Sequence, residues 1–302
     1  MEINKTKNSK RKMKVGLFNK TLWSKYLQIM GIVSSVVTLI SFFVTAKDIG
    51  INNWVIAGSF VAGVIILFVI MWLSANRKIY ADLIINKTAV KVMEGDIWEL
   101  IKKQPQDRSG EISVIGVNEF YDVIVNDRII ASTSLHGQYI NKITQEGKLD
   151  DLNRTIEHDI FLNKPGNSKT VASRKVGKQT QYELGSVVEF ESYILAAFTK
   201  FDTDNEAWLT AEEYTGFWMR FWENIDKIYA GRTINIPLMG AGITRFKNGK
   251  PSKQELLEVM LWTLKISGFH NTYPDKRINF VIYPADAPEI DFYRIQHNSN
   301  YR

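Results

Sequence analysis

The stretch from Ile234 to Phe246 reads I-N-I-P-L-M-G-A-G-I-T-R-F and combines a strand pattern with a glycine turn. The apolar run that ends at Met239 predicts a buried strand, and Gly240-Ala241-Gly242 then allows a tight turn with exposed backbone N–H groups. Ser252 and Glu255 have the spacing of a capping box and predict the start of the next helix. A strand, a glycine turn and a helix in this order favour binding of an anion such as a diphosphate, although a tight turn without any ligand has the same pattern.

The positive charge of the chain is concentrated at its N-terminus. The 302 residues include 38 Lys and Arg against 32 Asp and Glu, a net charge of +6. Residues 1–26 hold eight of these bases and a single acid, which leaves 30 bases and 31 acids in the remainder. A nearly neutral body argues against a nucleic-acid surface on the main domain. The chain has no cysteine, so disulfides, thiolate metal sites and cysteine nucleophiles are excluded.

Two uncharged runs follow this basic tail. Leu27–Ala46 and Trp54–Leu73 each contain 20 residues without a charged side chain. At about 1.5 Å per residue, each is long enough to cross a hydrocarbon core of about 30 Å. A cleaved signal peptide is rejected, because the first run is too long for its apolar region and a second run follows at once. We therefore predict a basic tail in residues 1–26 and a two-helix transmembrane hairpin in residues 27–76.

Basic residues flank this hairpin on both outer sides. The tail precedes the first span and Arg77 and Lys78 follow the second, whereas the short connection has only Lys47, next to Asp48. The positive-inside rule then places both termini in the cytoplasm, with the spans in the inner or plasma membrane. The domain formed by residues 77–302 is therefore expected to be cytoplasmic.

Small and hydroxyl residues form a stripe on the first span. Their spacing of three or four places them on one helix face: Gln28, Gly31, Ser34, Thr38, Ser41 and Thr45. Such a face lets helices approach closely in lipid and form hydrogen bonds across the contact. We expect the stripe either to pack on Gly58, Ala62 and Gly63 of its own hairpin or to meet copies of itself in a homo-oligomer.

Apolar runs alternate with helical patterns in the rest of the chain. Strands are predicted at Ala89–Met93, Ile112–Val117, Val187–Phe190, Tyr193–Phe198 and Ile278–Tyr283. Helices are predicted from the N-cap Asp96 to Lys103, after the Thr210–Glu213 capping pair along an aromatic stripe from Tyr214 to Ile228, and over Ser252–Ser267. Residues 127–180 are polar and weakly periodic, which predicts loops around short elements. The alternation predicts an α/β domain whose sheet is partly parallel.

The sequence assembles neither a catalytic nor a metal site. The spacing of an EF-hand loop recurs at Asp202, Asp204, Glu206 and Glu213, but Ala207 stands where that loop needs glycine. The four histidines lack a zinc spacing, and no serine lies on a nucleophile elbow. The glycine turn also fails the dinucleotide fingerprint, which has a third glycine where Arg245 stands. We therefore predict no catalytic residue, no metal and no resident cofactor.

Three short segments, taken in order, resemble a macro domain, the α/β/α fold that binds ADP-ribose. They are Gly95-Asp96-Ile97, Ile115–Asn118 and Pro237–Ile243, and the resemblance covers about residues 87–295. It implies a three-layer α/β/α domain with a mixed sheet. It also implies that the aspartate accepts a hydrogen bond from the adenine amino group and that the glycine loop wraps the diphosphate and ribose.

The resemblance implies a ligand site built from four parts of the chain. The expected ligand contacts are Asp96, Ile97, Asn118, Ser134, His136, Gly137, Gln138, Met239, Gly240, Ala241, Gly242, Ile243 and Thr244. Macro domains that hydrolyse ADP-ribose linkages usually carry an Asn-rich stretch and a glycine triplet in their first loop. Here that region reads Asn118–Asp122 and then Ser134–Gln138 with one glycine. This departure disfavours hydrolysis more than binding, and Ser134–Gln138 remains either an ordinary polar loop or a ligand contact.

A membrane hairpin followed by a divergent macro domain is similar to the membrane-bound effectors of Thoeris-type bacterial antiphage defence. This resemblance implies that a partner TIR-domain enzyme makes an ADP-ribose-derived signal from NAD and that the macro-like domain binds the signal. The protein would then self-associate, disrupt the membrane and halt the infected cell. Two alternatives remain: a membrane-tethered hydrolase of ADP-ribose conjugates, and a membrane-anchored interaction module without a nucleotide ligand.

Overall fold

The computed structural model describes residues 13–44, 50–102, 110–202, 205–271, 273, 275–298 and 301. The chain divides into two compact units. One comprises Met1–Ala81 together with Asp291–Asn298, and the other comprises Asp82–Ile290 together with Ser299–Arg302. The first unit therefore contains a segment near the C-terminus, which the sequence did not predict.

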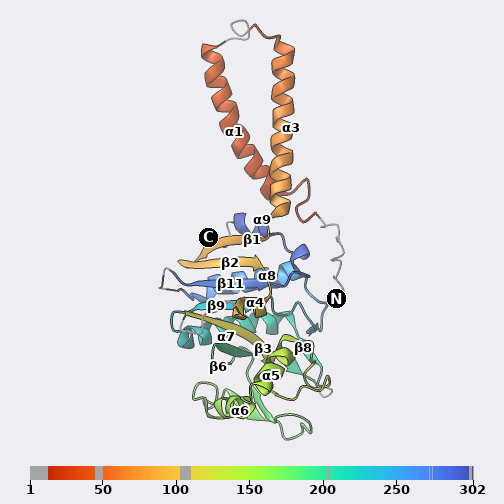
Figure 1. The fold of residues 1–302 in the computed structure, drawn as a ribbon, viewed down its shortest axis with the longest axis vertical. Helices are drawn as coiled ribbons and strands as arrows, with labels where there is room; N and C mark the ends of the chain where they lie inside the picture. Colours follow the sequence, from red (N-terminus) through yellow and green to blue (C-terminus); the bar gives the residue numbers. More distant parts are fainter. Residues whose placement is uncertain are drawn as a thin grey trace, which may run out of the picture. The chain divides into compact units, whose positions relative to one another are not determined.

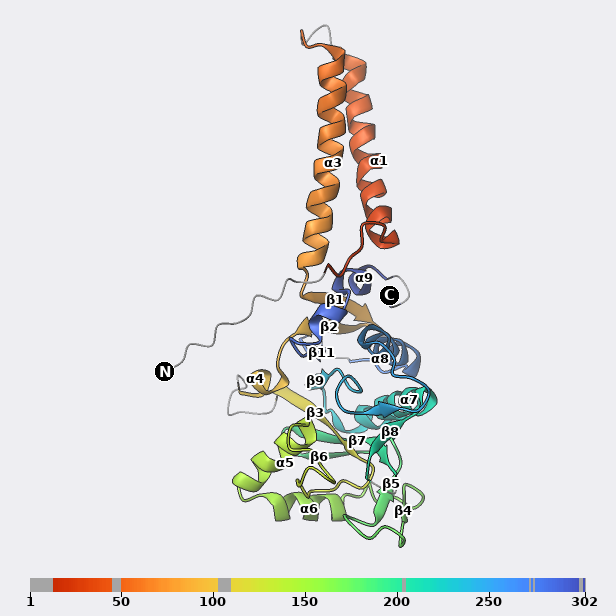
Figure 2. The same ribbon diagram turned by 90° about the vertical axis from the view of Figure 1, so that its right-hand side faces the viewer.

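The first unit is built on α1 (Lys20–Phe43) and α3 (Asn53–Arg77), which lie side by side in both views of the ribbon (Figures 1 and 2). By length and composition, each helix is apolar enough to cross a membrane. The first begins earlier than the predicted Leu27 because Asn19 caps it, with its side chain accepting the Leu22 N–H. The end of the predicted first span, Thr45 and Ala46, lies outside the described residues.

The small-residue stripe of α1 does not pack on the glycines of α3. A Cβ placed on Gly31, Gly58 or Gly63 would meet no atom of the described chain within 4 Å beyond its own helix. The hydroxyl of Thr38 donates instead to the carbonyl of Ser34, on the same helix, at 2.8 Å. Among the described residues these three glycines make no close contact between the helices, and the stripe from Gln28 to Ser41 is exposed.

The second unit is built on a sheet of nine described strands in the order β1-β2-β11-β9-β3-β7-β8-β10, with β6 beside β7. The strands are β1 (Tyr80–Ile85), β2 (Thr88–Glu94), β3 (Glu111–Asn118), β6 (Val187–Phe190), β7 (Tyr193–Phe201), β8 (Ala207–Leu209), β9 (Thr233–Pro237), β10 (Arg245–Phe246) and β11 (Arg277–Ile282). The neighbours among β2, β11, β9, β3 and β7 are parallel, whereas β6 and β8 run antiparallel to β7. Five parallel strands thus bring their carboxyl ends to one edge of the sheet.

Helices cover both faces of this sheet (Figure 2). Helices α7 (Ala211–Ile228) and α8 (Lys253–Ser267) lie on one face, and α4 (Ile97–Lys102) and α5 (Leu135–Gln145) lie on the other, with α6 (Leu149–His158) next to α5. A separate two-stranded sheet joins β4 (Ser168–Thr170) to β5 (Thr180–Tyr182). The predicted three-layer α/β/α arrangement with a mixed sheet is confirmed.

The two long helices of one face begin at the predicted caps. Thr210 with Glu213 and Ser252 with Glu255 each form a complete capping box. The aromatic stripe of α7 packs inward, as predicted, with Tyr214, Phe217, Trp218, Phe221 and Trp222 all at most 2% exposed. Large aromatic side chains bury about 150–250 Å² each, so this stripe supplies much of the apolar contact between α7 and the sheet.

The prediction of loops around short elements in residues 127–180 is wrong for the stretch that contains α5 and α6. Few residues in each helix are apolar, and only Tyr139, Ile140 and Ile143 of α5 and Leu152 and Ile156 of α6 belong to the core. These few residues do recur at helical spacing, so each helix is amphipathic and its apolar side packs on the core. The signal was overlooked because most of the surrounding residues are polar.

Strand β1 was not predicted, although its sequence alternates. Ala81, Leu83 and Ile85 are buried and the residues between them are exposed. Asn86 and Lys87, the two residues between β1 and β2, both have positive φ, 48° and 63°. This is the conformation of a tight hairpin turn, which Asn favours.

Candidate functional site

A pocket of about 790 Å³ lies at the carboxyl ends of the parallel strands. Its wall includes Asp96 after β2, Asn118 at the end of β3, Thr199 near the end of β7, Met239 after β9 and Tyr283 after β11. Open parallel sheets bind ligands outside these strand ends, and pockets of about 300–1,000 Å³ accommodate small ligands and cofactors. The topology of the sheet thus gathers residues that are far apart in sequence around one cavity.

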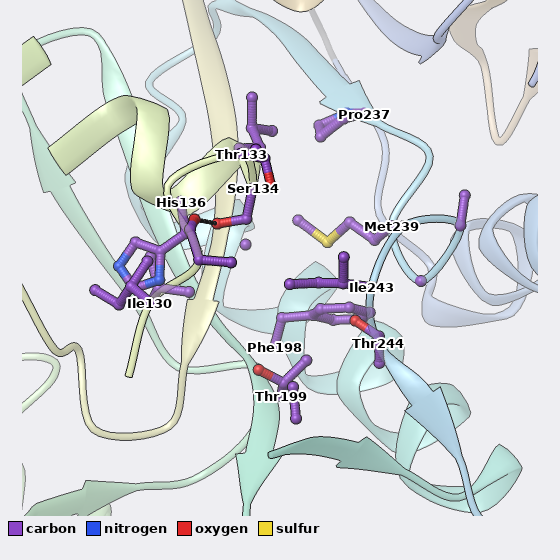
Figure 3. A pocket seen from close by; sticks show the side chains of 18 of the residues that line it. Ile130, Thr133, Ser134, His136, Phe198, Thr199, Pro237, Met239, Ile243 and Thr244 are labelled. Atoms are coloured by element: carbon purple, nitrogen blue, oxygen red, sulfur yellow. Dashed lines mark hydrogen bonds between the residues drawn. The ribbon is translucent and has the colours of Figure 1, made fainter. Parts of the chain in front are cut away.

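Twelve of the thirteen expected ligand contacts line this pocket. They are Asp96, Ile97, Asn118, Ser134, His136, Gln138, Met239, Gly240, Ala241, Gly242, Ile243 and Thr244. Figure 3 shows Met239 across the pocket from Thr133 and Ser134, with Phe198 and Thr199 at a third side. The glycine loop and Asp96 therefore face one continuous hollow.

Gly137 is the exception, because it does not line the pocket. A Cβ at this position would lie 2.2 Å from the carbonyl oxygen of Ala131. The glycine therefore allows the first turn of α5 to pack on the preceding loop. Ser134 caps this helix, and its Oγ accepts the Gly137 N–H at 3.0 Å. The segment Ser134–Gln138 is thus a helix start rather than a polar loop, and it presents its other members to the pocket.

Asp96 opens α4 at one end of the pocket. Its Oδ1 accepts the Trp98 N–H at 2.8 Å, so the side chain caps this short helix. The hydrogen bonds of Asp96 within the described chain use only Oδ1. The other carboxylate oxygen is available as an acceptor for a donor in the pocket. The predicted end of the helix at Lys103 lies outside the described residues.

Asn118 brings hydrogen-bond donors to the middle of the pocket. The residue is 2% exposed, and its Oδ1 accepts the N–H groups of Phe120 at 3.0 Å and Asp122 at 3.3 Å. Its buried Nδ2 has no partner among the described residues. A buried amide without a partner costs about 1–3 kcal/mol, so a ligand acceptor at this position would be favoured.

The glycine loop presents backbone N–H groups without acceptors. Within the described chain, none of the five N–H groups from Gly240 to Thr244 donates a hydrogen bond. Lys250 holds the opposite side of the loop, because its Nζ donates to the carbonyl oxygens of Ala241 at 2.9 Å and Gly242 at 2.6 Å. Successive unpaired N–H groups in a turn form an anion-binding concavity.

The helix after this loop begins at the predicted cap, Ser252, but it does not follow the loop directly. Strand β9 ends at Pro237 rather than Met239, and β10 lies between the glycine loop and α8. The first turn of α8 does not line the pocket. An anion at the loop would therefore be bound by the loop amides and not by the helix N-terminus.

His136 is buried in the pocket wall, 8% exposed (Figure 3). Burial lowers the pKa of His136 to about 4, against the opposing effect of Asp122, whose charge and backbone favour the protonated ring. The ring is therefore neutral at physiological pH. It shapes the pocket and adds no positive charge to it.

The acids of the rejected EF-hand pattern are occupied elsewhere. Glu206 pairs with Arg245 at 3.1 Å, and Glu213 pairs with Lys200 at 2.7 Å and closes the capping box of α7. Asp204 lies outside the described residues. Within the described residues no group of three or more His, Cys, Asp or Glu side chains is arranged to hold a metal ion.

Several wall residues were missed by the sequence reasoning. Trp98, Phe198, Tyr283 and Asp286 all line the pocket, and Tyr283 is an aromatic residue that remains 56% exposed at its rim. The rule that ligands bind at the carboxyl ends of parallel strands would have pointed to Phe198 and Tyr283. Trp98 and Asp286 follow only from how α4 and the turn after β11 fold back.

A sequence model of the family described as Thoeris protein ThsA, macro domain, matches residues 90–283. The chain belongs to this ThsA family. It is 30% identical over 268 residues to the Thoeris protein ThsA of Bacillus amyloliquefaciens (strain Y2), which covers 88% of this chain and 87% of that protein. A solved structure of a glycine-to-valine mutant of the Oceanobacillus iheyensis macrodomain with ADPR is similar over 72% of this chain and 96% of that chain. It has 14% identity and a TM-score of 0.39.

The pocket lies almost wholly within the residues matched to the ThsA macro domain. Its wall runs from Gly95 to Asp286, and the match ends at residue 283. The alignment with the relative covers 87% of that protein. In this chain it covers 88% of the residues, which is more than the segment 90–283 matched to the macro domain. This ThsA-family chain therefore shares with its relative both the macro domain and much of the sequence around it.

Proposed function

We propose that this protein is a membrane-anchored sensor-effector of Thoeris antiphage defence whose pocket binds an ADP-ribose-derived signal. The signal would be made from NAD by a partner TIR-domain enzyme. Membership of the ThsA family supports a role in Thoeris defence. The observation that carries the binding proposal is that Gly240 to Thr244 line the pocket and that their backbone N–H groups have no acceptor in the described chain.

The pocket has a suitable group for each part of such a ligand. The amides of the glycine loop would bind the diphosphate through charge-assisted hydrogen bonds. The free oxygen of Asp96 would accept the adenine amino group, with the exposed ring of Tyr283 available for stacking on the base. The unpaired Nδ2 of Asn118 would donate to the distal ribose or its substituent.

The hairpin would anchor the protein and act on the bilayer. Helices α1 and α3 have the length and composition of membrane spans, and basic residues flank both outer ends, which favours cytoplasmic termini. The open stripe of α1 would meet copies of itself when the signal binds. Disruption of the membrane by the resulting homo-oligomer would halt the infected cell.

The binding step is tested by calorimetric titration of the purified full-length protein with ADP-ribose. Asn and Asp cap helices equally well, so Asp96→Asn keeps the start of α4 but replaces an anionic acceptor with a neutral one. Hydrogen bonds to charged groups contribute about 1.5–3 kcal/mol against about 1 for neutral ones. We therefore expect Asp96→Asn to bind ADP-ribose about tenfold more weakly.

Asp82→Asn serves as the matched control, because Asp82 lies on β1 and does not line the pocket. Equal affinity of the unchanged protein and the Asp96→Asn variant would contradict the adenine assignment. Chromatography of the ligand after incubation separates sensor from hydrolase. A sensor returns an ADP-ribose conjugate intact, and a hydrolase releases free ADP-ribose from it.

A further inference from the structure

The chain passes between its two units after Ala81, after Ile290 and after Asn298. Of these three boundaries, the one after Ile290 is nearest in sequence to a residue that lines the pocket. Tyr283 and Asp286 line the pocket, and Asp291 already belongs to the hairpin unit. A short segment thus begins at the ligand site and ends in the other unit.

The pocket end of this segment is a tight turn fixed by an ion pair. The N–H groups of Asp286 and Ala287 donate to the Tyr283 carbonyl at 2.8 and 3.1 Å. The carboxylate of Asp286 lies 2.7 Å from Nζ of Lys253, the first residue of α8, and Lys253 also pairs with Glu289 at 2.9 Å. Because Asp286 lines the pocket as well, a ligand that contacts this carboxylate changes the pairing that fixes the turn.

The other end of the segment joins two helix caps. Asp291 is the N-cap of α9 (Phe292–His297), and its Oδ1 accepts the Arg294 N–H at 2.8 Å. Its Oδ2 accepts a hydrogen bond from Nδ2 of Asn19 at 3.3 Å. Asn19 is itself the N-cap of α1 and accepts the Leu22 N–H at 3.1 Å. One amide–carboxylate pair therefore connects the start of the first apolar helix with the start of the C-terminal helix.

Helix α9 also packs against both helices of the hairpin. Tyr293 belongs to a buried cluster with Leu22 of α1 and Ala75 of α3. The ammonium group of Lys14, which precedes α1, lies 4.7 Å from the centre of the Phe292 ring. A displacement of α9 therefore changes contacts with α1 and α3 at the same time.

We infer that the segment Tyr283–Asp291 transmits occupancy of the pocket to the hairpin, and that the Asn19–Asp291 pair is its contact with α1. The inference rests on the proposed function, because it takes the pocket as the ligand site and the hairpin as the effector. A ligand shifts the hairpin only as far as it binds one arrangement of the segment better than another. Coupling is reciprocal, so a change at the Asn19–Asp291 pair must also alter the affinity of the pocket.

The test uses the full-length protein in lipid nanodiscs with ADP-ribose as the probe. Hydrogen–deuterium exchange reports the amides of the first turn of α1, and calorimetry reports affinity. The Asn19→Asp substitution keeps a good N-cap but places two carboxylates side by side, so it breaks the pair. We expect saturating ADP-ribose to change exchange in this turn about fivefold or more in the unchanged protein. In Asn19→Asp this response is lost and the affinity changes by about the same factor.

Two further variants distinguish the effect of losing the Asn19–Asp291 pair from effects on helix capping and on folding. The double substitution Asn19→Asp/Asp291→Asn exchanges the two groups, so it restores an amide–carboxylate pair between two capping residues. Asn52→Asp makes the same change at the N-cap of α3, where Asn52 accepts the Trp54 N–H at 2.9 Å. Both variants should respond to ADP-ribose like the unchanged protein.

The outcomes distinguish this inference from the proposed function. If ADP-ribose binds but leaves exchange at the start of α1 unchanged, the link is wrong and the ligand site stands. The same holds if Asn19→Asp responds like the unchanged protein, or if the exchanged pair fails to restore the response. If the unchanged protein does not bind ADP-ribose, the proposed function fails and the link fails with it.

Discussion

Backbone conformation decides which residue each position of the glycine loop accepts. Gly240 has φ of +83°, and a Cβ there would lie 3.3 Å from the Tyr214 ring and 3.4 Å from Leu256 and Phe246. Gly242 has no positive φ, and its added Cβ would meet nothing within 4 Å in the described chain. The first glycine is therefore required by the fold, whereas the second leaves room for a ligand.

This difference predicts unequal effects of one substitution at two neighbouring sites. Gly240→Ala should lower the free energy of unfolding by about 2 kcal/mol, because a non-glycine residue in a left-handed conformation is strained by about 1–3 kcal/mol. Gly242→Ala should change it by less than about 0.5 kcal/mol. Urea unfolding followed by tryptophan fluorescence measures both, and equal losses would show that the loop is tightly packed at both positions.

The buried imidazole of His136 predicts a pH dependence of stability. Its pKa is about 4 in the folded protein, against about 6.5 when unperturbed. As the pH falls below 6.5, the unfolded state takes up a proton first, so stability is lost between about pH 6.5 and 4 and is unaffected above this range. The loss from this group at pH 5, relative to pH 7.5, is about 2 kcal/mol.

His136→Gln should remove this part of the pH dependence, because an amide does not titrate. Urea unfolding at pH 7.5 and pH 5 gives the comparison. The exposed His158 provides the matched control, and His158→Gln should keep the loss seen in the unchanged protein. An equal loss in all three proteins would mean that the ring of His136 is accessible to protons in the folded state.

Among the elements, the β4–β5 hairpin is joined to the rest of the domain in part by a buried ion pair. Arg174, in the loop between these strands, forms an ion pair with Asp122 at 2.7 Å, and the two side chains are only 9% and 1% exposed. The same guanidinium donates to Asn205 of the pocket wall at 2.9 Å. The contact therefore fastens the β4–β5 hairpin to the chain beside the pocket.

Removing one partner of this ion pair should be costly. Asp122→Asn leaves a buried guanidinium without its counter-charge, and we expect a loss of about 3 kcal/mol in the free energy of unfolding. Glu223→Gln breaks the exposed Lys227–Glu223 pair instead and should cost no more than about 0.5 kcal/mol. Thermal and urea unfolding measure both. A small loss in Asp122→Asn would show that water reaches Arg174.

At the scale of the whole molecule, we expect substitutions in the stripe of α1 to abolish membrane damage without affecting ADP-ribose binding. Leucine at Ser34 and Thr38 removes the small side chains through which copies of α1 would approach one another. The double substitution should abolish dye release from vesicles and toxicity in cells while ADP-ribose still binds. Val36→Leu/Ile40→Leu alters the opposite face of the helix and should keep full activity. Full activity of the Ser34/Thr38 variant would remove the stripe from the mechanism.

Local signals in the sequence were reliable where one residue decides the structure. The caps at Thr210 and Ser252, the parallel strands and the aromatic stripe of α7 all follow from side-chain chemistry and hydrophobic period, and all are present. Helices α5 and α6 were not predicted, because their few apolar residues, although at helical spacing, stand among many polar ones. Gly137 does not line the pocket, because it lies where the first turn of α5 packs closely on Ala131.

The sequence by itself determined the glycine loop, the two apolar helices and the polar residues around which a pocket is built, because each depends on local conformation or composition. Only the tertiary structure decided which strand ends meet. It placed Tyr283 and Asp286 in the same wall as Asp96 and joined Asn19 to Asp291 across most of the chain. Such contacts depend on the order of strands in the sheet and on the return of the C-terminal segment, which no local pattern encodes.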